Sequence, residues 1–248
     1  MVISSIHEST NQAQSSESWP QGGTPRLAVL VSGRGSNLQA LYESARAYGF
    51  ALDWLVIANR GDSYGLKWAR DQGLETELLV HADFSFREEF DRNLAGRLNQ
   101  FQPTLVVSAG FMRILTLAFF QSFRGLLINI HPSLLPAYPG LHTHARALQD
   151  GVVIHGATVH SVTPELDQGP ILAQAVVRVL PQDSEDSLGA RVLEMEHRLL
   201  PMVTWALLRG DLQLVNHRWS VLKPQTDLPS DMQFSSCLLH PQLSVSPG

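Results

Sequence analysis

Short apolar runs alternate with helix-like segments through most of the chain, and this alternation restricts the possible folds more than any other feature. Leu27–Val31, Trp54–Ala58, Leu105–Val107 and Leu126–Ile128 are short and apolar, which is typical of strands buried on both faces of a parallel sheet. Between them, apolar residues recur at helical spacing. Strands that alternate with helices form right-handed crossovers. The pattern predicts an α/β fold: a Rossmann-like, mainly parallel twisted sheet with helices on both faces.

The second half of the chain predicts a different connection. Val152–Val162 and Ile171–Val179 are strand-like, and the loop between them is too short for a crossover helix, so we expect an antiparallel pair that gives the sheet an antiparallel C-terminal strand. Ser187–Leu208 has one apolar face and predicts a long helix. Leu212–Leu214 and Trp219–Leu222 predict a small terminal hairpin.

Two helix features are predicted from local chemistry. Ser85 and Glu88 have the spacing of a capping box, which predicts a helix that begins there and ends near Asn99. Pro201 falls inside the predicted long helix and is expected to kink or restart it, because proline lacks the backbone N–H.

Composition sets the domain organisation and excludes several function classes. Residues 1–25 are rich in Ser and Gln and predict a disordered leader, residues 26–223 predict one folded domain, and residues 224–248 predict a flexible tail. The net charge of −5 argues against a nucleic-acid surface. Cys237 is the single cysteine, so neither an internal disulfide nor a cysteine-based metal site is possible. No apolar run reaches the ~18 residues of a membrane span, and we expect a cytoplasmic protein.

The segment Leu126–Gly140 is the first candidate for chemistry. Its apolar run delivers Asn129 and His131 at the end of a strand, and residues two apart on a strand face the same way. Three prolines then follow before Gly140 and stiffen the loop. We interpret the segment as a rigid mount for a carboxamide and an imidazole.

A glycine-rich segment, Ser32–Asn37, follows the first strand and opens a helix. It is not a dinucleotide fingerprint, because Leu38 replaces the third glycine and the second strand ends in Ala58-Asn59-Arg60 without an acidic residue. A helix N-terminus with free N–H groups suits one phosphate. The alternative is a plain tight turn capped by Ser or Asn.

Other strands also end in polar or glycine-rich segments. In parallel sheets, ligands bind at the carboxyl ends of the strands. Four segments are expected to meet at that edge: Ser32–Asn37, Ser108–Leu115, Asn129–His131 and the Val162–Gly169 loop. Their coincidence predicts a single site.

Two carboxylates have both a functional and a structural interpretation. Asp167 is either an ordinary turn aspartate or a carboxylate that faces His131 and supports its charged form. Glu196 borders the apolar face of the long helix and is either a site residue or a glutamate at the solvent margin.

The other reactive side chains give weaker signals. Five histidines fall between His131 and His160, but the sequence lacks the spacing of a catalytic zinc site, so no metal is predicted. Ser133 lacks a nucleophile elbow and is better interpreted as a turn residue.

These motifs together resemble the folate-dependent phosphoribosylglycinamide formyltransferases of the formyltransferase superfamily. The resemblance runs from about Arg26 to about Leu222. It rests on Ser32-Gly33-x-Gly35-Ser36-Asn37-Leu38, Ala109-Gly110-Phe111-Met112-Arg113-Ile114-Leu115, Asn129-Ile130-His131-Pro132-Ser133-Leu134-Leu135-Pro136, Gly140-Leu141-His142-Thr143-His144 and Glu165-Leu166-Asp167-x-Gly169-Pro170.

The resemblance implies transfer of a formyl group from 10-formyltetrahydrofolate, as co-substrate, to the amine of glycinamide ribonucleotide (GAR), without a metal. It implies Asn129, His131 and Asp167 as the catalytic group, with His160 assisting. It implies that the GAR site comprises Gly35, Ser36, Asn37 and Glu196. It implies that the folate site comprises Arg87, Met112, Arg113, Ile114, Leu115, Asn129, Val162, Thr163, Glu165 and Asp167.

Pro164 and Gln168 depart from the common family pattern in the loop around Asp167, so the details of pterin contact there are open. The nearest alternative is a 10-formyltetrahydrofolate hydrolase, which would use the same three catalytic residues with water. A methionyl-tRNA formyltransferase would need a C-terminal RNA-binding domain, and a noncatalytic nucleotide-binding module would not need the catalytic set. We therefore expect small-molecule substrates, no nucleic-acid or membrane partner, and a monomer or weak homodimer.

Overall fold

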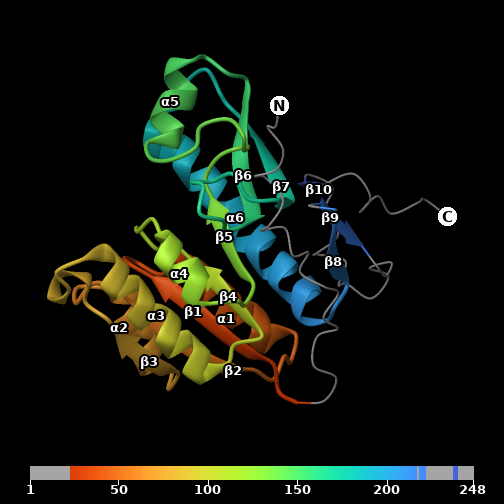
Figure 1. The fold of residues 1–248 in the computed structure, drawn as a ribbon. Coiled ribbons are helices and arrows are strands. Elements are labelled where there is room, and N and C mark those ends of the chain that lie inside the picture. The colour runs from red at the N-terminus through yellow and green to blue at the C-terminus, as the bar shows by residue number, and fades with distance from the viewer. Residues whose placement is uncertain (1–22, 217, 222–236, 240–248) are drawn as a thin grey trace, which may run out of the picture.

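Five parallel strands form one part of an eight-stranded sheet in the computed structural model, which describes residues 23–216, 218–221 and 237–239. The strand order is β10-β7-β6-β5-β4-β1-β2-β3 (Figure 1). The strands are β1 (Arg26–Val31), β2 (Asp53–Ala58), β3 (Glu75–Leu78), β4 (Leu105–Ser108), β5 (Leu127–His131), β6 (Ile154–Ser161), β7 (Ile171–Arg178) and β10 (Cys237–Leu239). β1 to β5 pair in parallel, whereas β6 is antiparallel to β5 and β7 is antiparallel to β6. The predicted α/β fold and the antiparallel β6–β7 pair are confirmed.

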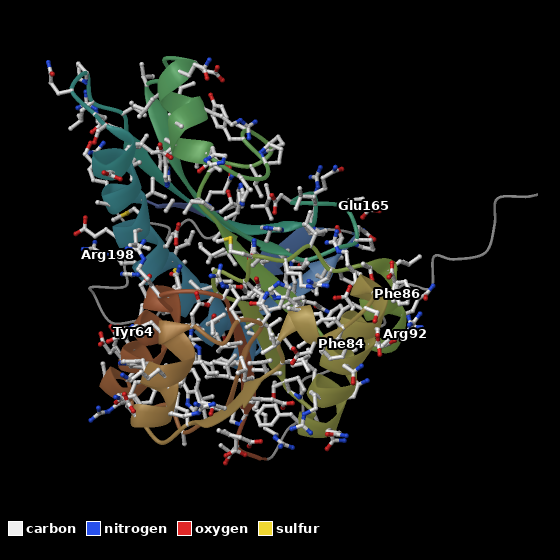
Figure 2. The ribbon with its side chains drawn as sticks, turned by 90° about the vertical axis from the view of Figure 1, so that its left-hand side faces the viewer. Tyr64, Phe84, Phe86, Arg92, Glu165 and Arg198 are labelled. Atoms are coloured by element: carbon white, nitrogen blue, oxygen red, sulfur yellow. The ribbon has the colours of Figure 1, made fainter. Side chains whose placement is uncertain are left out.

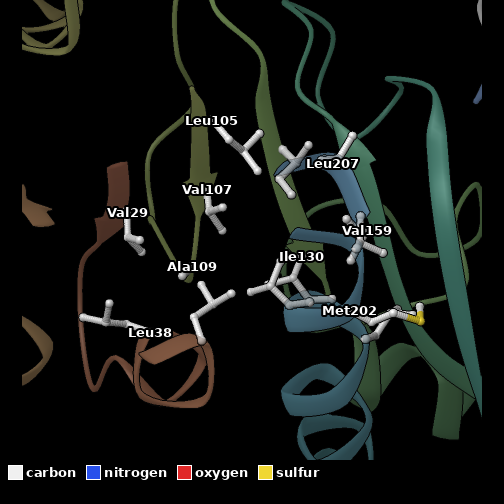
Figure 3. Packing of buried hydrophobic residues seen from close by; sticks show 14 of the residues in the cluster. Val29, Leu38, Leu105, Val107, Ala109, Ile130, Val159, Met202 and Leu207 are labelled. Carbon is white, nitrogen blue, oxygen red and sulfur yellow. The ribbon is translucent and has the colours of Figure 1, made fainter. Parts of the chain in front are cut away.

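Helices cover both faces of this sheet, as predicted. They are α1 (Ser36–Ala47), α2 (Tyr64–Asp71), α3 (Arg87–Phe101), α4 (Leu117–Ser122), α5 (Thr143–Gln149) and α6 (Glu185–Leu208), with a short 3₁₀ turn η1 (His81–Asp83). One apolar cluster joins the sheet to α1, α2 and α6, and a second joins it to α3 and α4. Figure 3 shows part of the first cluster, with Val29, Val107 and Ile130 of the sheet facing Leu38 of α1 and Met202 of α6.

The alternation within each strand explains the two clusters. In β1, Leu27, Val29 and Val31 belong to the first cluster, whereas Ala28 and Leu30 belong to the second. All five are fully buried. Since neither face of the central strands meets solvent, polar chemistry can only lie at the ends of the strands.

The long helix α6 differs from the prediction at Pro201. A reciprocal capping box between Ser184 and Ser187 starts the helix, and α6 then continues through Pro201 to Leu208 without restarting. Every residue from Leu199 to Leu207 is buried, so packing against the sheet outweighs the lost backbone bond. The expectation of a restart is wrong.

The capping box predicted for α3 is also wrong. The helix begins at Arg87, and its N-cap is Phe86, which makes no side-chain cap bond. Ser85 lies one residue too early. Glu88 and Glu89 occupy the first turn instead, where carboxylates interact favourably with the helix dipole.

The predicted terminal hairpin is present as β8 (Leu212–Val215) and β9 (Arg218–Val221), which pair antiparallel in a separate small sheet beside α6 (Figure 1). The predicted leader falls outside the described residues except for 23–25. Within the predicted tail, only β10 is described, and it pairs with β7. In the described parts of the chain, no helix combines the length and apolarity needed to cross a bilayer.

Candidate active site

Polar segments gather where β1, β4 and β5 end, because these three strands are parallel neighbours. The fourth predicted segment arrives by another route. β6 is antiparallel, so its last residue, Ser161, pairs with Ile128 near the start of β5. The loop that follows folds back along the sheet and brings Asp167 to His131. Its expected position at the carboxyl end of a parallel strand is therefore wrong, but the loop still reaches the same site.

Asn129 is held by its neighbour across the strands, His160. The two residues are paired in the β5–β6 register, and Asn129 Nδ2 lies 3.2 Å from His160 Nε2. His160 Nδ1 donates to the Ser161 carbonyl at 2.9 Å, so Nε2 is the free acceptor of a neutral ring. Burial lowers the pKa of His160, which favours this neutral form. One N–H of the Asn129 amide is thus fixed, and its second N–H remains for a ligand.

His131 faces acceptors at both ring nitrogens. Nε2 donates to the Tyr138 carbonyl at 2.9 Å, and Nδ1 lies 3.5 Å from the Asp167 carboxylate. The latter distance is long for a hydrogen bond, so a proton on Nδ1, which is fixed in the ring plane, is not taken up by Asp167 and can be donated to a ligand oxygen. Since Nε2 is occupied, Nδ1 is the nitrogen available for chemistry.

Asp167 is fixed by the backbone of the proline loop. The Gly140 N–H donates to Asp167 Oδ2 at 2.8 Å, and the side chain is only 9% exposed. Asp167 adopts φ 55°, a left-handed conformation that is uncommon for residues other than glycine. Oδ1 lies 3.7 Å from His160 Nε2. The carboxylate thus lies between the two histidines. An aspartate that only shaped the turn would not need this position.

The loop that carries these groups is tied to β6 and β7. Thr158 Oγ1 donates to the Ser133 carbonyl and accepts from the Leu135 N–H, and the Gln174 amide donates to the Leu135 carbonyl. Ser133 Oγ donates to the Ala137 carbonyl at 2.6 Å. Ser133 is therefore a turn residue, as interpreted from the sequence.

The glycine-rich segment turns sharply into α1 at Gly35. This residue has φ 73° and lies so close to Gly65 of α2 that a Cβ built on it would be 2.6 Å from the Gly65 Cα. The first backbone bond of α1 runs from the Gln39 N–H to the Gly35 carbonyl, so the N–H groups of residues 36–38 precede it. The side-chain cap of the alternative interpretation is absent from this N-terminus.

Glu196 of α6 reaches the same segment. Its Oε2 accepts from Asn37 Nδ2 at 2.7 Å, and the residue is 7% exposed, so it is not a glutamate at the solvent margin. Burial raises the pKa of Glu196, and the bond from Asn37 opposes this rise. Asn37 Oδ1 is buried without a hydrogen-bond partner, so a ligand that donates to it would satisfy it.

The 110–116 segment is anchored by a residue of α3 and by Ser32, which follows β1. Arg87 donates to the Ile114 carbonyl at 2.9 Å, and Ser32 Oγ accepts from the Met112 N–H at 2.8 Å. Met112 and Ile114 are 69% and 49% exposed, which leaves an apolar surface on this segment. Arg113 instead turns inward, stacks on the Phe90 ring at 4.3 Å and loses part of its hydration, which lowers its pKa.

The remaining predicted folate residues differ in their surroundings. Leu115 and Val162 pack with the α3–α4 apolar cluster. Thr163 Oγ1 donates to the Glu165 carbonyl at 3.3 Å, and Glu165 is exposed at the outer surface, as is Phe86 (Figure 2). Their contact with a folate stays a prediction.

Sequence reasoning missed several groups that shape the site. The Tyr138 carbonyl and the Gly140 N–H are backbone groups with no sequence signal. Asp91 of α3 is fully buried, accepts from the Thr116 N–H at 2.6 Å and faces Arg113 at 3.8 Å. Asp91 falls on the otherwise apolar face of α3, and this position in the sequence could have indicated a buried, paired carboxylate.

Two of the remaining histidines, His144 and His155, form a pair. His144 Nδ1 and His155 Nε2 lie 3.1 Å apart, and burial lowers the pKa of His155 to about 4. Among the described residues, no group of three His, Cys, Asp or Glu side chains has metal-binding geometry.

Comparison with known proteins identifies the class that this fold and site define. The sequence model of the formyl transferase family matches residues 25–204. The chain belongs to the formyl transferase family.

Individual relatives show which enzymes of this family the chain is similar to. The chain is 46% identical over 189 residues to phosphoribosylglycinamide formyltransferase of Escherichia coli, covering 76% of this chain and 89% of that protein. It is 45% identical over 194 residues to a trifunctional purine biosynthetic protein of Drosophila melanogaster, of which it covers only 14%. A crystal structure of glycinamide ribonucleotide transformylase 1 from Symbiobacterium toebii superimposes with a TM-score of 0.78 at 40% identity, over 82% of this chain and 96% of that one.

Proposed function

We propose that the protein transfers the formyl group of 10-formyltetrahydrofolate to the amine of GAR, giving formylglycinamide ribonucleotide and tetrahydrofolate in purine biosynthesis. The observation that carries the proposal is that Asn129, His131 and Asp167 come together at the same end of the parallel strands as the Gly35–Asn37 turn. The first three supply acyl-transfer chemistry, and the turn supplies a phosphate site. The Escherichia coli relative at 46% identity is named phosphoribosylglycinamide formyltransferase, and the similar structure from Symbiobacterium toebii at 40% identity is a glycinamide ribonucleotide transformylase.

The GAR phosphate would bind at the N-terminus of α1. The N–H groups of residues 36–38 precede the first helical bond, and a helix N-terminus favours an anion. Asn37 and Glu196 lie beside it, and a carboxylate and an amide oxygen are suitable acceptors for ribose hydroxyls. This arrangement would hold the amine toward the ends of β4 and β5.

The folate would lie along the 110–116 segment. Backbone groups of Met112 to Leu115, held by Arg87 and Ser32, would bind the pterin edge. Exposed Met112 and Ile114 would contact its ring and aryl parts. Pro164 and Gln168 stand in the loop that closes the other side, so their effect is predicted to fall on the KM for folate rather than on turnover.

Chemistry would begin when the GAR amine attacks the formyl carbon. A C–N bond forms, and the carbonyl π electrons move to oxygen. The second N–H of Asn129 and a proton on His131 Nδ1 would stabilise this oxyanion, a contribution of about a hundredfold to a thousandfold per donor in comparable sites. Asp167 would balance the imidazolium and pass the amine proton, directly or through water, to N10 of the folate. The C–N10 bond then breaks, and no metal or covalent enzyme intermediate is needed.

The nearest alternative is hydrolysis of the same folate by water. The Gly35–Asn37 turn argues against it, because a hydrolase needs no phosphate site. The test is a spectrophotometric assay of folate release with and without GAR. Release that requires GAR supports transfer, and equal release in its absence supports hydrolysis.

Variants then test the residues. His131→Ala and Asp167→Ala are expected to abolish transfer while the far-UV circular dichroism spectrum stays native. Asp53→Asn, which changes an exposed carboxylate at the amino end of β2, away from the site at the carboxyl ends of the strands, is the control and should leave turnover unchanged. Near-wild-type turnover in either site variant would refute the mechanism. We also predict, on the basis of sequence, a cytoplasmic enzyme that is a monomer or weak homodimer.

A further inference from the structure

The β8–β9 hairpin lies beyond residues 25–204, which the family model matches, yet it contacts the strand that bears a site residue. Trp219 of β9 donates its indole N–H to Ser161 Oγ of β6 at 3.1 Å. Both residues are buried, with exposed fractions of 9% and 8%. Trp219 also packs in the apolar cluster between the sheet and α6. The hairpin therefore touches the sheet through one defined polar contact.

Ser161 is fixed from several directions. Its N–H donates to the Pro170 carbonyl at 2.9 Å. Its carbonyl accepts from His160 Nδ1 at 2.9 Å and lies only 1.8 Å from the place that a Cβ on residue 169 would occupy, so only glycine fits there. With the indole bond, Ser161 uses its N–H, its carbonyl and its hydroxyl, and a shift of this residue would disturb all three.

The Ser161 carbonyl decides which nitrogen of His160 carries the proton. Because that carbonyl takes the proton of Nδ1, Nε2 is left to accept from Asn129 Nδ2. Successive side chains on a strand point to opposite faces. Ser161 Oγ thus meets the hairpin on the α6 face, while the His160 ring meets Asn129 on the other face. Ser161 therefore contacts Trp219 through its hydroxyl on one face of the sheet and, through its carbonyl, the ring of His160, which lies on the other face.

We propose that Trp219 is a positioning residue for formyl transfer. Through Ser161 and His160 it holds the Asn129 amide in the orientation that aims its second N–H at the formyl oxygen. Trp219 touches neither substrate. The inference rests on the proposed function, because the orientation matters only if Asn129 stabilises the oxyanion. A phenylalanine would fill most of the same volume without the N–H, so the polar contact can be separated from the packing.

The test compares Trp219→Phe with a matched control on the same scaffold. Trp205 of α6 also donates its indole N–H to a serine, Ser44 of α1, at 2.8 Å, and it is fully buried away from the site. Trp219→Phe is expected to lower kcat about tenfold, because small misplacements of catalytic groups carry costs of this order, while KM for GAR and folate stays within twofold. Trp205→Phe should lose similar thermal stability but keep kcat within twofold.

A second variant and a spectroscopic measurement complete the test. Ser161→Ala removes the same hydrogen bond by deleting the acceptor, and this single variant carries the test if Trp219→Phe does not fold. The double variant should lose no more kcat than either single variant. ¹⁵N NMR of the ring should show His160 protonated at Nδ1 in the wild type and a mixture of tautomers in Trp219→Phe. Unchanged kcat, additive losses or an unchanged tautomer would overturn the proposal. If wild-type release does not require GAR, the proposed function fails, but the tautomer measurement still decides the positioning.

Discussion

Replacing Gly35 by alanine should destabilise the protein in two ways, through the left-handed backbone conformation of this residue and through its close approach to Gly65. Gly35 has φ 73°, and an added Cβ would lie 2.6 Å from the Gly65 Cα, a backbone atom that cannot turn away. The left-handed conformation costs about 1 kcal/mol for alanine. Carbon atoms prefer separations of about 3.5–4.0 Å, so α1 and α2 would have to move apart by about 1 Å. Overpacking of this kind adds about 1–3 kcal/mol.

Gly49 provides the control, because it has φ 70° and nothing lies within 4 Å of its added Cβ. Gly49→Ala should lose only the conformational term, which for a domain of this size corresponds to a melting temperature lowered by about 3 °C. Gly35→Ala should lose about 2–4 kcal/mol in all, corresponding to a melting temperature lowered by about 10 °C. Differential scanning calorimetry measures both variants.

The same displacement moves the N–H groups of Ser36 and Asn37 from their positions. We therefore expect Gly35→Ala to raise the Kd for GAR by about tenfold to a hundredfold, measured by isothermal titration calorimetry, with folate affinity unchanged. Gly49→Ala should bind GAR normally. A Gly35→Ala variant as stable as Gly49→Ala would refute the close approach, and a Gly35→Ala variant with wild-type GAR affinity would refute the phosphate assignment.

Three further predictions follow from the site and its supports. Asp167→Asn keeps an acceptor for the Gly140 N–H but removes the charge that faces His131, so kcat should fall at least about a hundredfold; turnover within fivefold of wild type would contradict this. Asp91→Ala leaves the Thr116 N–H and Arg113 without their partner and should cost about 3 kcal/mol in urea unfolding and raise KM for folate, whereas a neutral effect would show that the 110–116 segment is held otherwise. The buried ring of His155 has its pKa lowered to about 4, so the unfolded chain binds the extra proton first, and stability should be complete above pH ~6.5 and fall by at most about 3 kcal/mol as the pH drops toward 4. His155→Gln should flatten that dependence, and an equally steep profile in the variant would exclude His155 as its source.

Much of the fold was predictable because the strands are buried on both faces. Leu27–Val31 and Leu126–Ile128 are apolar at every position, a pattern that few other structures allow. Helix ends were less predictable. The start of α3 is set near Arg87, which bonds a distant carbonyl, rather than by the local Ser85–Glu88 pattern. Pro201 does not restart α6, because the packing of the helix outweighs its local cost.

The site residues were predictable as side chains but not as a geometry. Asn129 and His131 were expected to face the same way from their spacing on one strand. The path by which the loop brings Asp167 to His131 was not predicted, because β6 runs antiparallel to β5 and its loop must fold back along the sheet. The groups that hold His131 and Asp167 are a carbonyl at Tyr138, which any residue type could supply, and an N–H at Gly140, which any type except proline could supply. Their roles depend on the conformation of the loop rather than on its composition.

The bond between Asn37 and Glu196 spans 159 residues of sequence. A ribosome must therefore release most of the chain before this pair can form, even though the first strand and α1 are made early. Contacts of such long separation slow folding, because loop closure must precede them. We expect nascent chains that end before α6 to carry an N-terminal sheet without substrate affinity, so that GAR cannot be captured until synthesis is nearly complete.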